Sequence, residues 1–461
     1  MIRQCIAILL LPLLLVGAGC LSGSQPTLKK INLTYWRIQD EPDALAASVA
    51  AYGKLHPNIT IDVKKFREED YERMLLEALA EKRGPDMFSI PNTWLRGWQK
   101  KLLPAPKETT ITTQTVNAQR QIAVVNQKSP AITFRDLTIG CVEAVSKDVI
   151  FKTIAEPEAT PPVKAEDKIW GLPLSVDTLA MYVNRDLLKK ANIEKPAVTW
   201  TELRDQTIKL TIRQDNAIKQ SGAALGLADN IKYLTDIMAA LMMQNGAVMA
   251  DDSGYPKFHV FPADRGDAEF PPGVEAYLFY KSFSTPGSVN HSWDAALPNS
   301  LDAFVTGRTA IFFGFPADAA VIQARAPKLD FEVAKLPQID PGKVFNVADY
   351  PVEVVSKQTA HPDESWDFIQ FIARPEQVAA YLQKTRRPTA LRALIASQLT
   401  APDVAPFADQ LLTAKSWYRG KDYAKAQAAF SEMINFVPLE LDPKYGDIVG
   451  RAAAKVGDTL R

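Results

Sequence analysis

The spacing of apolar residues along this chain switches repeatedly between the period of a strand and that of a helix. Apolar residues at alternate positions predict strands, and apolar residues three or four positions apart predict helices. Ile31, Leu33 and Tyr35 show the first spacing. Strands that alternate with helices indicate a parallel sheet with right-handed crossovers. The predicted elements of this region are strands at 31–35, 59–63 and 87–90, and helices at 42–55 and 71–79.

One stretch in the middle of the chain, residues 168–186, separates two regions. It reads KIWGLPLSVDTLAMYVNRD, in which the β-branched and aromatic run 179–183 predicts a strand and the polar residues 184–186 predict the start of a helix. Strand and helix units precede it, and a helix-rich region follows. We therefore expect this strand to cross between two lobes.

The remaining patterns predict helices and two surface loops. Thr199 and Glu202 have the spacing of a capping box, which marks a helix start. The Thr-rich residues 108–115 and the Pro-containing residues 156–162 are predicted loops. Further helices are predicted at 134–149, 233–243, 363–373 and 417–437.

Composition adds to this picture mainly by excluding some classes of protein. The 461 residues are too many for one core and predict two or three domains. Hydrophobic residues make up 47% and charged residues 23%, which is typical of a soluble globular protein. Lys plus Arg and Asp plus Glu both number 53, so the balanced charge argues against nucleic acid as a partner.

The N-terminus has the pattern of an export signal. Arg3 precedes the apolar run 6–16, which is too short to span a bilayer, and small residues at 17–19 lead to Cys20. This resembles a lipoprotein signal at 1–19, with lipid on Cys20 and a flexible tether at 20–27; a plain secretory signal or an uncleaved anchor is the alternative. Cys141 would then be the remaining cysteine and is expected to be buried, without a disulfide.

The central stretch resembles the lobe-crossing segment of extracellular solute-binding proteins of the carbohydrate, maltose-binding type, which deliver ligand to ABC importers. Four other strings are similar to that family in the family's order: YGKLHPNITIDV, GPDMFSIPNTWL, SLDAFVTGRTAIFFGF and LDFEVAKLP. The resemblance implies an α/β, two-lobed periplasmic-binding-protein fold with a mainly parallel sheet in each lobe and three hinge crossings, the later two near 349–354 and 387–392. Lobe 1 would comprise 28–175 plus 353–390, and lobe 2 would comprise 176–352 plus 391–461.

A carbohydrate cleft needs aromatic rings for the apolar faces of the sugar, and carboxylates, amides or Arg for its hydroxyls. Such groups are expected on loops at the ends of strands that face the gap between lobes. Asp177 is the strongest candidate, because it lies where the family often has an acidic ligand contact; a hinge hydrogen bond is its alternative role. The candidate ligand-binding residues are Trp36, Trp94, Asp177, Trp293, Phe315, Asp349, Tyr350 and Arg387. Core packing is the alternative for the three Trp residues, and a solvated surface position is the alternative for Arg387.

The function that follows is capture of a sugar or oligosaccharide between the lobes and its presentation to an ABC permease complex, by a lipid-anchored, monomeric protein on the outer face of the cytoplasmic membrane. No cofactor and no metal are expected. A polyamine is an alternative ligand, because Asp177 and Asp349 with aromatic walls would suit a cation. A sugar phosphate would need more convergent Arg or Lys than the sequence reveals. A glycoside-processing enzyme is a weaker alternative, since no local motif marks a catalytic pair.

Overall fold

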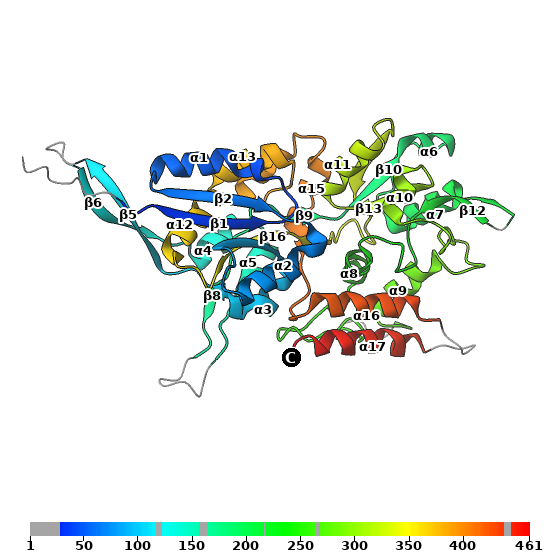
Figure 1. The fold of residues 1–461 in the computed structure, drawn as a ribbon. Coiled ribbons are helices and arrows are strands. Elements are labelled where there is room, and N and C mark those ends of the chain that lie inside the picture. Colours follow the sequence, from blue (N-terminus) through cyan, green and yellow to red (C-terminus); the bar gives the residue numbers. More distant parts are fainter. Residues whose placement is uncertain (1–27, 117–121, 156–163, 216, 264–267, 438–443) are drawn as a thin grey trace, which may run out of the picture.

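The computed structural model describes residues 28–116, 122–155, 164–215, 217–263, 268–437 and 444–461, which form two lobes side by side (Figure 1). Each lobe has its own hydrophobic core, one built around Tyr35, Phe88 and Trp366, the other around Met238, Tyr280 and Trp293. The predicted signal, tether and loop at 156–162 lie outside the described residues.

The sheet of lobe 1 has the strand order β2-β1-β3-β16-β4. β1 (Ile31–Arg37) is parallel to both β2 (Ile59–Lys65) and β3 (Met87–Pro91), as predicted. β16 (Pro351–Ser356) returns from far along the chain and runs antiparallel to β3 and to β4 (Leu102–Leu103). The main helices of this lobe are α1 (Ala46–Leu55), α2 (Glu68–Ala80), α5 (Glu143–Val149), α12 (Pro362–Ile372) and α13 (Pro375–Thr385).

The sheet of lobe 2 has the order β11-β12-β13-β10-β14, and here the expectation of a mainly parallel sheet is wrong. β10 (Ala180–Asn184) lies antiparallel to both β13 (Thr309–Gly314) and β14 (Phe331–Lys335). Only β12 and β13 pair in parallel among the described strands of this sheet. The other elements are β11 (Ile212–Gln214), β12 (Ala217–Ala223), α6 (Arg185–Lys190), α7 (Trp200–Leu210), α8 (Leu234–Gln244), α9 (Pro272–Ser282), α10 (Ser300–Val305), α11 (Pro316–Arg325), α16 (Tyr423–Asn435) and α17 (Tyr445–Asp458).

Three short strands connect the lobes and pair with one another. β15 (Asn346–Asp349) is antiparallel to β9 (Asp177–Thr178) and parallel to β17 (Ala414–Lys415). The first two crossings lie where the sequence placed them. The third lies at β17 and not at 387–392, because Ile395 and Leu411 still belong to the core of lobe 1. Lobe 2 therefore resumes after β17, later than the expected residue 391.

Several local predictions are confirmed and others are corrected. The capping box at Thr199 forms as predicted, with each partner bonded to the other. Residues 108–115 are not a loop, because β5 (Glu108–Val116) and β6 (Ile122–Pro130) form a hairpin that projects from lobe 1 (Figure 1). The helix expected at 134–149 is divided by Cys141 into α4 (Phe134–Gly140) and α5. The shorter elements are η1 (Pro42–Leu45), η2 (Asn92–Trp94), α3 (Leu95–Trp98), η3 (Gln99–Lys101), β7 (Ile150–Lys152), β8 (Asp167–Ile169), α14 (Arg392–Gln398), α15 (Ala405–Ala408) and η4 (Leu411–Thr413).

Candidate ligand-binding site between the lobes

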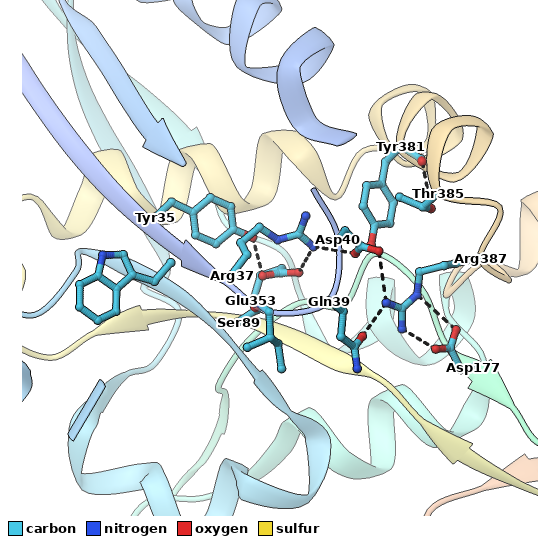
Figure 2. Close-up of polar contacts among 12 residues, drawn as sticks. Tyr35, Arg37, Gln39, Asp40, Ser89, Asp177, Glu353, Tyr381, Thr385 and Arg387 are labelled. Carbon is cyan, nitrogen blue, oxygen red and sulfur yellow. Dashed lines mark hydrogen bonds and ion pairs between the residues drawn. The ribbon is translucent and has the colours of Figure 1, made fainter. Parts of the chain in front are cut away.

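A buried ion pair joins the first crossing to the loop after α13 (Figure 2). Arg387 donates from Nε to Asp177 Oδ1 at 3.3 Å and from Nη2 to the other carboxylate oxygen. Its Nη1 donates to Gln39 Oε1 at 2.6 Å and lies 3.5 Å from Asp40 Oδ1. Arg387 and Asp177 are only 4% and 5% exposed. The structure thus brings together two residues that the sequence singled out, in the hinge contact that was the alternative role of Asp177.

Backbone geometry holds these side chains at one point. Gln39 and Asp40 follow the C-terminal end of β1, where Gln39 has a left-handed φ of 70°. Arg386 ends α13 with a φ of 57° and so turns the chain toward the hinge. The next residues then pair with the first crossing, since the amide of Val176 donates to the carbonyl of Pro388 at 3.1 Å.

Burial and charge act in opposite directions on these carboxyl groups. Burial raises the pKa of Asp177 to about 6, although the Arg387 charge lowers it. Burial also acts to raise the pKa of Asp40, but the charges of Arg387 and Arg37 outweigh it and lower that pKa. Because the guanidinium does not lose its proton, the Asp177 and Arg387 pair is ionised at neutral pH.

A second buried network lies beside the first and stiffens the end of β1 (Figure 2). Arg37 donates from Nη2 to Glu353 Oε1 at 3.0 Å, and the hydroxyl of Tyr35 donates to the same carboxylate. The hydroxyl of Tyr381 donates to Asp40 and so connects this network to Arg387. Glu353 is fully buried in β16, where only a firmly paired charge is tolerated.

A third network centres on Asp148, a residue of α5 that no sequence pattern singled out. Its carboxylate accepts from Asn92 Nδ2 at 3.0 Å and from the hydroxyl of Tyr350 at 2.7 Å. It also accepts from Ser416 Oγ and from Arg419 Nη1, the latter at 2.9 Å. The carboxylate of Asp148, which belongs to lobe 1, therefore binds the residues just after the second crossing and those just after the third.

Carboxyl groups crowd the hinge on the side of lobe 2. Asp349 is the register partner of Asp177 in the small hinge sheet. Burial raises the pKa of Asp349, and the charge of Asp177 raises it further. Burial and the charge of Asp349 likewise raise the pKa of Asp236, near the start of α8. These half-buried carboxyl groups could hydrogen-bond hydroxyls or hold a cation.

The aromatic candidates divide into two groups. Trp36 and Trp94 are half-buried, and each packs one face on another ring: Trp36 lies 4.3 Å from Phe66 and Trp94 is stacked on Trp98 at 5.6 Å, both between ring centroids. Their placement at the ends of β1 and β3 agrees with a role near the gap between the lobes.

Three other candidates are core residues in this structure, which for Trp293 is the alternative that the sequence left open. Trp293 has no exposed surface, and its Nε1 donates to Asn230 at 2.8 Å. Phe315 is buried against Tyr233. Tyr350 is buried with its hydroxyl on Asp148. Their apolar surface is already covered by protein, so they can shape a ligand site but do not face it.

An open cavity of about 550 Å³ lies between the lobes beside the third crossing. Arg96 of α3 and Lys147 of α5 approach it from lobe 1. Met243 and the chain after α8 form the wall on lobe 2, and Lys415 and Arg419 lie at the crossing itself. Its volume is within the range of small-molecule sites.

Comparison with known proteins places this geometry in a family. The profile of a family described as bacterial extracellular solute-binding protein matches residues 47–408. A binding protein of Brucella abortus (strain 2308) is 24% identical over 230 residues, which are 48% of this chain and 51% of that protein. The chain thus spans about half the length of the curated relatives it matches.

Solved structures share the fold over nearly the whole chain. The cyclic α-maltosyl-1,6-maltose binding protein from Arthrobacter globiformis has a TM-score of 0.68 at 19% identity, covering 94% of this chain and 99% of that one. The sugar-binding protein MalE from Xanthomonas citri has a TM-score of 0.64 at 18% identity, covering 93% and 97%. An ABC transporter solute-binding protein from Thermotoga lettingae, bound with α-D-tagatose, has a TM-score of 0.64 at 17% identity, covering 94% and 100%.

The family profile spans most of the chain, and the two lobes with their paired crossings have the architecture of these solute-binding proteins. This chain belongs to the family of bacterial extracellular solute-binding proteins.

Proposed function

We propose that this protein captures a carbohydrate between its lobes and delivers it to the permease complex of an ABC importer, while lipid on Cys20 holds it at the outer face of the cytoplasmic membrane. The observation that carries the proposal is the hinge: three paired crossings, with polar groups of both lobes gathered beside them. Fold neighbours that bind tagatose or maltose-type sugars support the ligand class.

The mechanism requires a ligand that contacts both lobes at once. Such a ligand binds the closed arrangement more strongly than the open one and shifts the population toward closure. The hinge sheet permits this, since each crossing has only two to four residues of strand. The permease would then recognise the paired outer surfaces of the closed form.

Ligand-dependent unfolding tests this proposal. The full-length chain, purified in detergent, is heated with mono- and oligosaccharides, polyols, polyamines and peptides in turn. A ligand present at 100 times its dissociation constant adds about 2.7 kcal/mol to the free energy of unfolding. We expect a saturable shift with one sugar class, which Trp94→Ala weakens. Phe134→Ala, an exposed ring on α4, is the matched control and should leave the shift unchanged.

A polyamine is the second candidate ligand, favoured by the crowded carboxyl groups of Asp349 and Asp236. Asp177 is less available to a polyamine than the sequence implied, because Arg387 already neutralises it. A shift with polyamines and with no sugar would replace the carbohydrate in this proposal. Mass spectrometry of the membrane-bound protein, beside a Cys20→Ser variant, tests the anchor.

A further inference from the structure

The cavity between the lobes is lined by four basic side chains that lie far apart in the sequence. Arg96 and Lys147 come from lobe 1, while Lys415 and Arg419 come from the third crossing. Its carboxylates are those of Asp251 and Asp252, on the lobe 2 wall. The basic groups therefore outnumber the acidic ones, and they approach from both sides of the hinge.

Most of this positive charge is not neutralised by the protein. Arg419 pairs with Asp148 at 2.9 Å. Within the described part of the chain, no ion pair joins Arg96, Lys147 or Lys415 to a carboxylate. The Arg96 guanidinium lies 4.7 Å from the ring centroid of Phe151, a contact that fixes its position and leaves its charge unpaired.

Asp251 does not supply the missing counter-charge. Its Oδ1 accepts from the amides of Ser253 and Tyr255, both at 3.0 Å, and its Oδ2 lies 3.6 Å from Lys257 Nζ. Lys415 instead lies 4.9 Å from the ring centroid of Phe345. Two cations held over aromatic rings on opposite sides of one cavity form a preorganised arrangement for an anionic group.

The interactions among the basic side chains of this cavity would change when an anion binds there. Burial lowers the pKa of Arg96, the nearby charge of Arg419 lowers it further, and the charge of Asp148 acts in the opposite direction, so Arg96 and Arg419 lie close enough to repel each other. An oxyanion between them replaces repulsion with attraction. An oxyanion that also reaches Lys415, whose ammonium lies over Phe345 at the edge of the lobe 2 core, would contact both sides of the cavity, which is the differential contact that closure needs.

From this convergence we propose that the cavity binds an oxyanion group of the transported solute, so that the captured carbohydrate is an acidic one, carrying a carboxylate, phosphate or sulfate. The inference rests on the proposed function, because it names the class of sugar for the same interlobe site. It also answers the sequence argument against a sugar phosphate, since the required basic residues come together only in the folded chain.

Calorimetric titration of the full-length chain tests this inference. The probes are glucuronate, an oligouronate, glucose 6-phosphate and glucose 6-sulfate, each beside its uncharged parent sugar, together with inorganic phosphate alone. We expect at least one acidic sugar to bind about tenfold or more tightly than its parent, with the advantage decreasing as salt is added. The acid that binds best identifies the anionic group.

Arg96→Met keeps the side-chain stem on Phe151 and removes the charge, so it should abolish most of that advantage. Arg374→Met is the matched control, because Arg374 lies 5.2 Å from the ring centroid of Phe371 and does not line the cavity. Its affinity for acidic sugars should match that of the unmodified chain.

The outcomes separate the two proposals. Equal binding of acidic and neutral sugars, unchanged in Arg96→Met, overturns this inference and leaves sugar capture standing. Binding of inorganic phosphate that depends on Arg96, without binding of any sugar, supports an anion-binding cavity and excludes a carbohydrate as the ligand. Binding of polyamines alone overturns both.

Discussion

The buried pair of Asp177 and Arg387 gives a prediction whose size follows from its geometry. Arg387→Met removes a guanidinium that makes two contacts to a carboxylate with only 5% exposure. Breaking one partner of a buried pair costs about 3–5 kcal/mol, because the other charge stays buried and unpaired. Protonation of Asp177 relieves part of that cost, so we expect a loss near 3 kcal/mol at neutral pH.

The pH dependence separates this cause from a general loss of packing. Without Arg387, the pKa of Asp177 in the folded protein rises above its present value of about 6, while in the unfolded chain it is near 3.9. Between those two values the folded state binds more protons, so the free energy of unfolding decreases as pH rises. The loss caused by Arg387→Met should therefore be at least about 1 kcal/mol greater at about pH 8 than at about pH 5.

Urea unfolding at the two pH values measures both quantities. Arg386→Met is the matched control, because the adjacent Arg386 forms its ion pair with Asp403 at the surface, where such pairs contribute about 0–1 kcal/mol. Adding Asp177→Asn to Arg387→Met should remove the extra pH dependence. A loss below about 1 kcal/mol, or one equal at both pH values, would refute the assignment of Asp177 as a buried charge that depends on Arg387.

Three further predictions concern other parts of the hinge and core. Asp349→Asn should raise the free energy of unfolding by about 1 kcal/mol at about pH 8 and have little effect at about pH 5. The reason is that burial raises the pKa of this carboxyl, so its ionisation opposes folding. Urea curves that change equally at both pH values would contradict this. Asp148→Asn should lower the free energy of unfolding measured in urea by about 2 kcal/mol, more than Tyr350→Phe does, because this carboxylate accepts from several donors. Equal losses in the two variants would argue against Asp148 as the shared acceptor. Trp293→Phe should lower the free energy of unfolding by about 2 kcal/mol, because it leaves Asn230 Oδ1 without its donor. The affinity for a ligand found by titration should stay unchanged. A weakened affinity at unchanged stability would instead indicate that Trp293 contacts the ligand.

The secondary structure was largely predictable because it depends on local spacing. The alternating residues of β1 and the capping box of α7 determine their elements within a few positions. The hairpin β5–β6 was missed because its first strand, β5, is Thr-rich and lacks the apolar alternation that marks a strand. The antiparallel order of lobe 2 was missed for a different reason, since spacing predicts a strand and says nothing of its direction.

The candidate site was predictable only in part, because its groups meet across long separations in the chain. Asp177 and Arg387 could be selected singly because each lies in a segment that resembles a family segment near the cleft, but nothing local indicates that they touch. Asp148 carries no signal in the sequence, since it is one acidic residue on a predicted helix. Trp293 is a different case: its sequence position allowed either a ligand contact or core packing, and the folded chain buries it.

The polar networks also determine where the hinge can move. Asp177 is bound by Arg387, and Asp148 binds both Tyr350 and Ser416, so each crossing is fastened to lobe 1 by a buried carboxylate. Breaking any of these contacts to allow rotation would leave a charge or its donor buried and unpaired. The backbone changes of closure are therefore expected beyond these contacts, where each crossing enters lobe 2. Arg96 and Lys147 are then expected to stay fixed with lobe 1, and any approach of the chain after α8 toward them would narrow the basic cavity between the lobes.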